Sequence, residues 1–456
     1  MAKSRSGLMS PSQSGGNMLP TADDLKAMWE NSGLKEKILY TVGVIALYRF
    51  CAQVPIWGVN AQAIQSMAAN QLVGFLDMFS GGALTSVSIM ALGIGPYITA
   101  SIVMQLLAVV IPRLEEMQKD EGEAGRKKIS QITRYVAVVL SLLQGALVMK
   151  FIGSIPGALE PGVSPFWFYP SAVMCLATGA MFALWLAEVI TERGIGNGGS
   201  ILIFTGIMAS IPLFAHRTMD LVNADPTGGK AFALVALLTI YLAIIVMIIF
   251  FQEGVRKIFI TSGKRQVGNK VYGGQSMHIP FKVNPASVMP VIFAFAVLSF
   301  PATVLQVIQQ NNPTGFMLDV VRFYGQYLAP GAPGYLVVEF MLILFFTFFY
   351  ASIIPSMQPK SIADNLKKHG SAIPGIKPGR PTAEKLEEIL TRLTFIGAVG
   401  LALIVMIAGS ATSLTGMQTL RGLGPTSLII MVGVALDTVN QIKVHLLARS
   451  YEGFLK

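Results

Sequence analysis

The side chains of this sequence that could do acid–base, nucleophilic or metal chemistry do not form the sets that an active site needs. The histidines and cysteines lie far apart and lack the spacing of metal ligands. They are His216, His278, His369, His445, Cys51 and Cys175. A phosphate-binding loop of the GxxxxGK type is also absent. The sequence predicts no catalytic residue, no metal and no cofactor, and therefore a protein that is not an enzyme.

The informative chemistry is instead that of the main chain. The stretch from Met78 to Leu107 reads MFSGGALTSVSIMALGIGPYITASIVMQLL, which is apolar enough for lipid but interrupted by Gly81, Gly93 and Pro96. Irregular backbone at membrane depth finds no water for its N–H and C=O groups, so it must be buried in protein or line a wet cavity. The break predicts a channel or a binding site.

The composition indicates a membrane protein with several spans. Hydrophobic residues make up 53% of the 456 residues, charged residues 13%, and the mean hydropathy is +0.60, whereas soluble domains carry about 25% charged residues. Cys51 and Cys175 lie in apolar runs and are interpreted as small buried apolar residues. The net charge of +10 comes from Lys and Arg between these runs.

Ten apolar runs approach the length of about 20 residues that crosses the hydrocarbon core. They cover residues 38–55, 87–111, 132–151, 166–188, 200–214, 231–251, 285–308, 335–354, 393–408 and 426–441. An even number of spans puts both termini on the same side. Within the runs the charged residues are few, and they suit structural partners or span ends better than an ion relay. They are Arg49, Glu188, Glu339 and Asp437, besides Arg134 and Lys150 near the two ends of the third run.

The basic residues predict the orientation. Most of the 34 Lys and Arg lie in the polar head, in the loops after the second, fourth, sixth and eighth runs, and in the tail. The opposite side carries only Lys150, Arg217, Lys230, Arg322 and Arg421. By the positive-inside rule, both termini are expected in the cytoplasm.

The broken stretch and several further segments resemble the SecY family of protein-conducting channels. The further segments are LWLAEVITERGIGNGGSILIF from Leu184, YGGQSMHIPFKVN from Tyr272, ADNLKKHG from Ala363, PGIKPG from Pro374 and TRLT from Thr391. The resemblance extends over about residues 40–452. It implies an all-α polytopic membrane protein with ten transmembrane helices, arranged as two pseudo-symmetric halves of five with a re-entrant plug. The implied parts are a cytoplasmic head 1–37, halves 38–218 and 219–442, and a tail 443–456.

The resemblance also implies a pore ring. A constriction without charge excludes hydrated ions by dewetting and offers no strong contact to a passing chain. The family's ring positions correspond to Ile94, Ile98, Gly199, Ile203, Ile292 and Ile430. An arbitrary isoleucine in such a protein more often packs in the bundle or faces lipid. Gly199 departs from the aliphatic residue of the family, so this sector is expected to be thinner or filled by a neighbour such as Leu202.

The segment of about residues 60–82 corresponds to the family's plug, which re-enters the outer funnel as a short helix. From spacing alone, an ordinary interfacial loop is an equal alternative. The implied plug helix comprises Val73, Gly74, Phe75, Leu76, Asp77, Met78, Phe79 and Ser80. Gly81 and Gly82 are expected to supply the turn that follows.

A lateral gate is implied between spans two and three on one side and spans seven and eight on the other. Polar contacts across this seam are expected from Thr99, Gln144 and Ser287, each worth about 1 kcal/mol. Alternatively, Thr99 and Ser287 bond a carbonyl of their own helix.

The resemblance implies that two long basic loops, about residues 252–284 and 356–392, dock a ribosome or the motor ATPase SecA, although ordinary positive-inside loops explain part of their charge. The candidate contact residues are Arg256, Lys257, Lys264, Arg265, Lys377 and Arg380. Lys377 stands where the family carries an arginine, so it lacks the planar fork of a guanidinium.

The predicted function is a channel that passes unfolded secretory polypeptides and releases signal sequences and membrane helices sideways into lipid. The alternative is a secondary transporter with broken helices. The resemblance implies the partners SecE, SecG, the ATPase SecA, the translating ribosome, signal sequences, nascent polypeptides and membrane lipid. The expected location is the bacterial plasma membrane.

Overall fold

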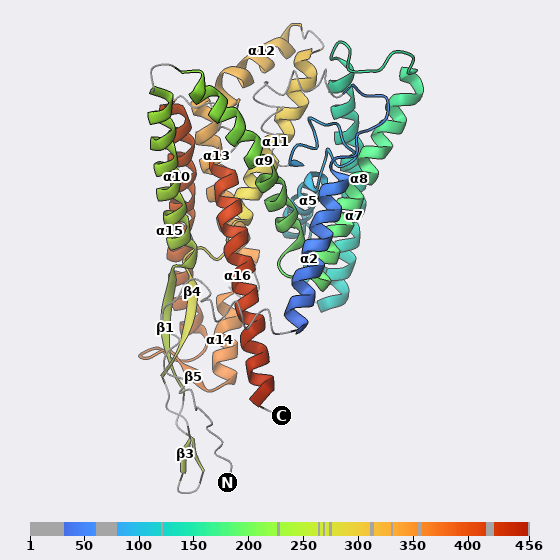
Figure 1. Cartoon of the computed structure of the whole chain (residues 1–456). Coiled ribbons are helices and arrows are strands. Elements are labelled where there is room, and N and C mark those ends of the chain that lie inside the picture. The colour runs from blue at the N-terminus through green and yellow to red at the C-terminus, as the bar shows by residue number, and fades with distance from the viewer. Residues whose placement is uncertain are drawn as a thin grey trace, which may run out of the picture.

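The computed structural model describes residues 32–60, 80–119, 122–225, 229–262, 265–267, 270–272, 276–310, 314–329, 332–353, 358–415 and 424–454. Long helices that run side by side dominate this part of the chain (Figure 1). The helices of the N-terminal part are α2 (Ser32–Cys51), α5 (Gly95–Val110), α6 (Pro112–Lys119), α7 (Gly122–Gly153), α8 (Pro165–Arg193) and α9 (Gly198–Asn223). The C-terminal part contains α10 (Gly229–Glu253), α11 (Met289–Gln310), α12 (Phe316–Phe323) with the π-helical turn η1 (Tyr324–Leu328), α13 (Pro333–Ile353), α14 (Pro359–Lys368), α15 (Arg380–Thr415) and α16 (Pro425–Phe454).

Each of the ten predicted apolar runs overlaps one of these helices. Seven helices in the described residues are long and apolar enough to cross a membrane: α7, α8, α9, α10, α13, α15 and α16. Two shorter apolar helices lie at Gly95–Val110 and Met289–Leu305. The prediction of a helical, multi-pass membrane protein is therefore confirmed. The predicted boundary between the halves at 218/219 falls inside α9, which continues to Asn223.

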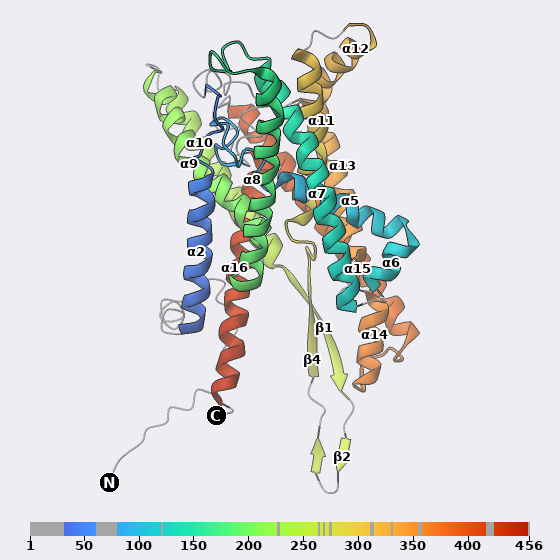
Figure 2. The same cartoon turned by 90° about the vertical axis from the view of Figure 1, so that its right-hand side faces the viewer.

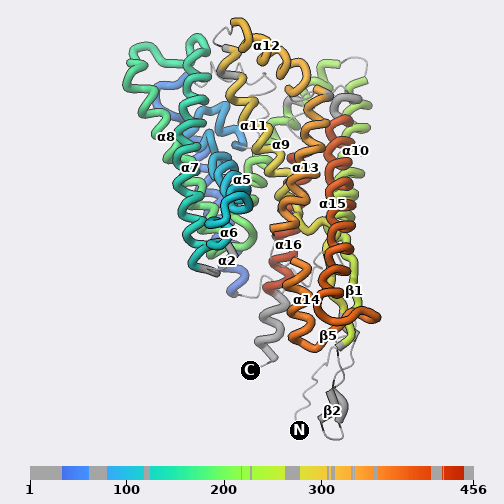
Figure 3. The backbone as a smooth tube through the Cα atoms, turned by 180° about the vertical axis from the view of Figure 1, so that it is seen from behind, coloured from blue at the N-terminus to red at the C-terminus, as the bar shows by residue number. Residues whose placement is uncertain are grey.

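The helices form two groups that meet around shared central elements. α2, α5, α7 and α8 lie on one side of the bundle, α10, α13 and α15 lie on the other, and α9, α11 and α16 lie between them (Figures 1 and 3). One apolar core runs through both groups and includes Ile94, Ile203, Ile292 and Ile430. The start of α2, the end of α16, α14 and the strands lie at one end of the bundle, and α12 lies at the other (Figure 1).

The broken stretch is irregular, as its glycines and proline predict. Residues 81–94 form turns, and α5 begins only at Gly95, with Pro96 in its first turn. This backbone is buried rather than exposed to lipid, since Val87 and Ser88 are fully covered. It pairs with the segment after α2, where the Ile56 N–H donates to the Val87 carbonyl (2.9 Å) and the Ile89 N–H to the Val54 carbonyl (3.1 Å). The irregular chain is thus satisfied by protein, as membrane depth requires.

The two basic loops fold together into one small unit, which makes the expectation of an all-α chain incomplete (Figure 2). β1 (Val255–Ser262) pairs antiparallel with β4 (Ser276–Lys282) and, near its end, with β5 (Ser371–Ala372) from the second loop. β2 (Arg265–Val267) pairs with β3 (Lys270–Tyr272) at the tip. The unit has its own apolar core, formed by Ile258, Ile260, Phe281, Leu366, Leu386, Leu390 and Leu393.

The second basic loop ends earlier than predicted, because α15 begins at Arg380 and runs without interruption to Thr415. The first turns of this helix are charged, so its apolar run begins well after the helix itself. They are stabilised by pairs at helical spacing, from Arg380 to Glu384 (3.0 Å) and from Arg392 to Glu388 (2.6 Å).

Candidate pore and its surroundings

The six residues predicted to form a ring come from four helices that are far apart in the sequence. Ile94 precedes the first turn of α5 and Ile98 lies one turn later. Gly199 and Ile203 lie in the first turns of α9, Ile292 lies in the first turn of α11, and Ile430 lies near the start of α16. The structure brings them together around two cavities inside the bundle.

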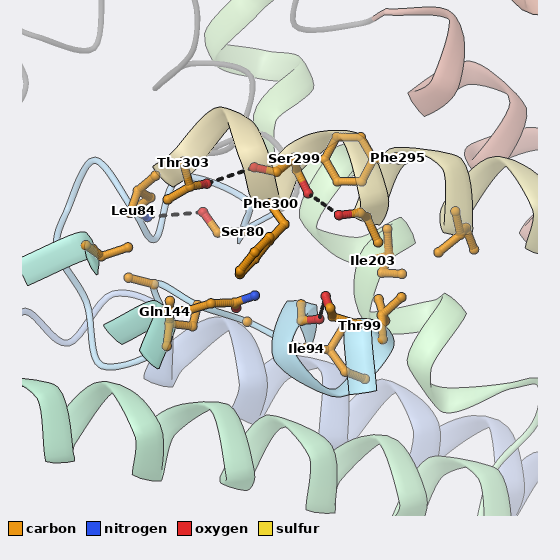
Figure 4. Close-up of a pocket in the computed structure, with 18 of the residues that line it drawn as sticks. Ser80, Leu84, Ile94, Thr99, Gln144, Ile203, Phe295, Ser299, Phe300 and Thr303 are labelled. Carbon is orange, nitrogen blue, oxygen red and sulfur yellow. Dashed lines mark hydrogen bonds between the residues drawn. The ribbon is translucent and has the colours of Figure 1, made fainter. Parts of the chain in front are cut away.

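The first cavity, of about 140 Å³, is mostly apolar (Figure 4). Its lining includes Ile94, Ile98, Ile203, Ile292 and Ile430, together with Ser80, Leu84, Thr99, Gln144, Phe295, Ser299, Phe300 and Thr303.

The second cavity, of about 430 Å³, is more polar. Its lining includes Ile94, Ile98, Gly199, Ile203 and Ile292, together with Tyr97, Gln105, Arg134, Glu188 and Glu192.

The two cavities lie one above the other along the bundle, with isoleucines between them. On α7 the first cavity is lined by Gln144 and Val148, whereas the second is lined by Ser130 and Arg134. The same shift along the helix occurs on α11. Ile94, Ile98, Ile203 and Ile292 belong to both linings, so these four side chains form a wall that the two cavities share.

Gly199 has no side chain, and the Asn197 and Ile94 side chains lie close to the position that a Cβ would take there. A Cβ built on Gly199 would lie 3.4 Å from Cδ1 of Ile94. Leu202, which was expected to fill this sector, is 1% exposed and lines neither cavity. The Ile94 side chain thus takes the space that a larger residue at 199 would occupy.

Two of the three predicted gate residues line the first cavity. Thr99 on α5 and Gln144 on α7 lie opposite Ser299 and Thr303 on α11 (Figure 4). Thr99 donates to the Gly95 carbonyl of its own helix (3.1 Å), which agrees with the alternative interpretation of this residue. Ser299 and Thr303 were missed because serine and threonine within apolar helices usually bond the preceding turn, as these two also do.

Ser287 lies elsewhere. Its Oγ donates to Oδ2 of Asp437 on α16 (2.8 Å), so it neither bonds its own helix nor lines the first cavity. Ser287 precedes α11 in a turn with a φ of 53°, a conformation that no residue pattern in this segment predicts.

Of the predicted plug residues, Val73, Gly74, Phe75, Leu76, Asp77, Met78 and Phe79 lie outside the described residues. Ser80 is buried and lines the first cavity. The turn that follows has positive φ at Gly81 and Gly82, as expected for glycines in a tight reversal. Nη1 of Arg49 on α2 donates to the Gly81 carbonyl (3.0 Å), which explains a charged residue inside the first apolar run.

Glu188 and Glu339 of the apolar runs also have partners. Nε of Arg134 donates to Oε1 of Glu188 (2.9 Å), and Oγ1 of Thr426 donates to Oε1 of buried Glu339 (2.8 Å). Among the described residues, no group of three or more His, Cys, Asp or Glu is arranged to hold a metal ion.

The predicted docking residues lie on the small unit formed by the two basic loops. Arg256 and Lys257 are exposed on β1, and Lys377 and Arg380 are exposed before and at the start of α15. Arg265 lies in β2, and Lys264 lies outside the described residues. The structure therefore joins the two loops that carry these residues in one unit.

Solved structures share this fold. The chain aligns over 90% of its length with "The structure of a protein conducting channel", at a TM-score of 0.63 and 16% identity, covering 91% of that chain. A structure that describes the plug domain of the SecY protein aligns at a TM-score of 0.64 and 18% identity, with the same coverage of both chains. Sec61 in the canine ribosome-channel complex aligns at a TM-score of 0.61 and 16% identity, also with 90% and 91% coverage.

Sequence comparison identifies the family directly. The SecY family model matches residues 88–439. The protein translocase subunit SecY of a Synechocystis species is 42% identical over 94% of this chain and 96% of its own length. That of Haemophilus influenzae is 41% identical over 93% of this chain and 95% of its own length. Because the match extends over most of the sequence and the fold agrees with it, the chain belongs to the SecY family of protein-conducting channels.

Proposed function

We propose that unfolded polypeptides cross the membrane through the space between the two groups of helices, and that the isoleucines between the two cavities form its barrier. The observation that carries this proposal is the common wall of Ile94, Ile98, Ile203 and Ile292. Ile430 and Gly199 complete the ring, each lining one of the two cavities. Aliphatic side chains at this position exclude hydrated ions by dewetting and yield to a passing chain without a strong contact.

The proposal includes ten spans in two pseudo-symmetric halves, with the link between the halves at residues 224–228. The ten proposed spans are the seven long apolar helices together with α2 and the short apolar helices α5 and α11. Residues 60–82 form the plug in this scheme. Its support is the buried Ser80 in the first cavity and the turn at Gly81.

We further propose a lateral gate at the contact of α11 with α5 and α7. These helices come from different halves and pack directly against each other. The first cavity lies between them, with Thr99 and Gln144 on one side and Ser299 and Thr303 on the other (Figure 4). Ser299 and Thr303 replace Ser287 in this assignment, because Ser287 contacts Asp437 instead.

The unit of the two basic loops is proposed as the cytoplasmic docking surface for SecA or a ribosome. Its support is the exposed charge of Arg256, Lys257, Lys377 and Arg380 on a rigid support, and the ribosome-channel complex among the similar structures. This surface and the start of α2 and end of α16 lie at one end of the bundle, in agreement with cytoplasmic termini in a bacterial plasma membrane. SecE and SecG are proposed as further subunits.

Crosslinking to a trapped substrate tests the main proposal. A secretory chain stalled during export should form disulfides with cysteines placed at Ile94 or Ile292, and not with a cysteine at Val235, which is 62% exposed on the outside of α10. Labelling of Ile94 and Ile292 positions by small solutes alone, without crosslinks to the stalled chain, would favour a secondary transporter.

The gate has its own test. Cysteines at Gln144 and Ser299, joined by a short bismaleimide, should block release of a membrane helix into lipid. Cysteines at Gln144 and Val173, which lie on neighbouring helices of the same half, provide the matched control. If both crosslinked variants release the helix normally, the gate lies at another seam.

A further inference from the structure

One stripe of α16 connects the ring to two turns from different halves of the molecule. Ile430, Gly433, Asp437 and Gln441 are spaced by three or four residues, so they share one face of the helix. Ile430 lines the first cavity, and the other three contact the turns that precede α11 and α9.

The turn before α11 is fixed by polar contacts on both sides. Ser287 has a φ of 53°, a left-handed conformation that side chains other than glycine rarely adopt and that persists only where the surroundings impose it. Its carbonyl accepts from Nδ2 of buried Asn284 (2.8 Å), and its Oγ donates to Oδ2 of Asp437 (2.8 Å). Ile292 follows five residues later.

Close packing supports the same contact. A Cβ on Gly433 would collide with Cγ1 of Val288, the residue next to Ser287. The absence of a side chain at 433 therefore allows the turn to rest directly on α16, one helical turn from Asp437.

The turn before α9 is fixed in a parallel way. Gly196 has a φ of 88°, and its N–H donates to Oε1 of Gln441 (2.8 Å). The neighbouring Ile195 N–H donates to Oγ1 of Thr41 on α2 (3.1 Å), so the turn is held between the two ends of the chain. Gly199 and Ile203 follow three and seven residues after Gly196.

We propose that Asp437 and Gln441 are positioning residues of the channel. By fixing the starting points of α11 and α9 on one face of α16, they set the distances among Ile292, Ile203 and Ile430 and thereby the aperture of the closed ring. This inference rests on the barrier function proposed above. It adds that the aperture is controlled from a polar contact layer near the middle of α16, outside the ring itself.

Ion leak through the purified channel in liposomes tests this inference. Gln441→Leu removes the acceptor for the Gly196 N–H and should raise the resting leak about fivefold, the effect expected if one hydrogen bond is lost only in the closed state. Gln441→Glu keeps an acceptor oxygen at the same reach and should restore the low leak. Val444→Ala, at a 65% exposed position of the same helix, is the matched control and should leak like the unmodified channel.

The contact between Ser287 and Asp437 provides an independent test, with variants that disturb packing little. Asp437→Ala and Ser287→Ala should each raise the leak, and their double variant should leak no more than either alone, since both remove one interaction. Asp437→Asn, which retains an acceptor oxygen, should leak less than Asp437→Ala.

Ile292→Asn separates this inference from the barrier proposal. If Ile292→Asn leaks while Gln441→Leu and Asp437→Ala do not, the ring stands and the positioning role is refuted. If Ile292→Asn does not leak either, the barrier proposal fails, and the positioning role fails with it. A lowered melting temperature of Gln441→Leu without increased leak would show a purely structural contact and would also refute the positioning role.

Discussion

The Cδ1 atom of Ile94, the residue just before α5, lies 3.4 Å from the position that a Cβ would take on Gly199 of α9. A barrier needs every sector closed, but it does not need each helix to supply its own side chain. Ile94 is 6% exposed and contributes to the linings of both cavities. In the proposed ring, the Ile94 side chain therefore borders the sector at Gly199, which has no side chain of its own.

Ile94→Ala should therefore raise ion leak more than Ile98→Ala. Because residue 199 is a glycine, it has no side chain that could fill the space left by the Ile94 side chain. Leak in reconstituted liposomes measures the difference. Adding Gly199→Leu to Ile94→Ala should lower the leak again, because the new side chain enters the vacated space. Equal leak from both alanine variants would show that another residue closes this sector.

Gly179→Ala should destabilise the protein strongly. Gly179 on α8 lies against the backbone of the irregular segment, and a Cβ there would collide with the Ile89 carbonyl. Because this carbonyl is part of the main chain, it cannot rotate away as a side chain could. Overpacking of this kind costs about 1–3 kcal/mol. Gly145→Ala is the matched control, since its Cβ would meet α8 at an ordinary 3.6 Å. Thermal unfolding in detergent distinguishes them, and equal melting temperatures would contradict the close approach.

Arg49→Met should loosen the turn that follows the proposed plug. The hydrogen bond from the guanidinium to the Gly81 carbonyl is charge-assisted, and such bonds contribute about 1.5–3 kcal/mol. A cysteine placed at Ser80, which is 5% exposed, should then react faster with a water-soluble maleimide. A cysteine at Ala83, which is fully buried in the same segment, reports whether the whole segment has opened. Unchanged labelling at Ser80 would show that other contacts hold the turn.

Arg256→Glu combined with Lys257→Glu should weaken ribosome binding. Both side chains are exposed on β1, and contacts of Lys and Arg with RNA phosphates weaken as salt is raised. Co-sedimentation with ribosomes at several salt concentrations should show lower affinity and a shallower salt dependence. Lys150→Glu, at the end of α7 remote from this unit, reverses one positive charge elsewhere and should have no effect. If Lys150→Glu weakens binding equally, net charge rather than this surface is responsible.

Thr426→Val alone should destabilise the protein more than Thr426→Val combined with Glu339→Leu. The hydroxyl of Thr426 donates to the carboxyl of Glu339, which is 2% exposed between α13 and α16. Removing only the donor leaves a buried carboxyl without this partner, at a cost of about 1–3 kcal/mol, whereas an apolar pair leaves no buried polar group behind. Thermal unfolding of the single and double variants measures the difference. A more stable single variant would show that the carboxyl has another partner.

The sequence by itself determined the class of protein and the general course of the chain. Apolar runs predict helical spans because an apolar solvent leaves the main chain no other hydrogen-bond partners, and the glycines and proline before Ile98 predict a break because they cannot continue a helix there. Family motifs identified Ile94, Ile203, Ile292 and Ile430 as candidates. The fold class, the broken segment and the family follow from local composition and motifs, so the sequence suffices for them.

Tertiary structure alone decided which residues meet. Ser287 contacts Asp437, the Ile94 side chain lies beside Gly199, and the two basic loops share one core around Leu386. Each of these contacts joins residues far apart in the chain or depends on a side-chain direction set by helix packing. Periodicity and composition describe one segment at a time, so they carry no information about such distances.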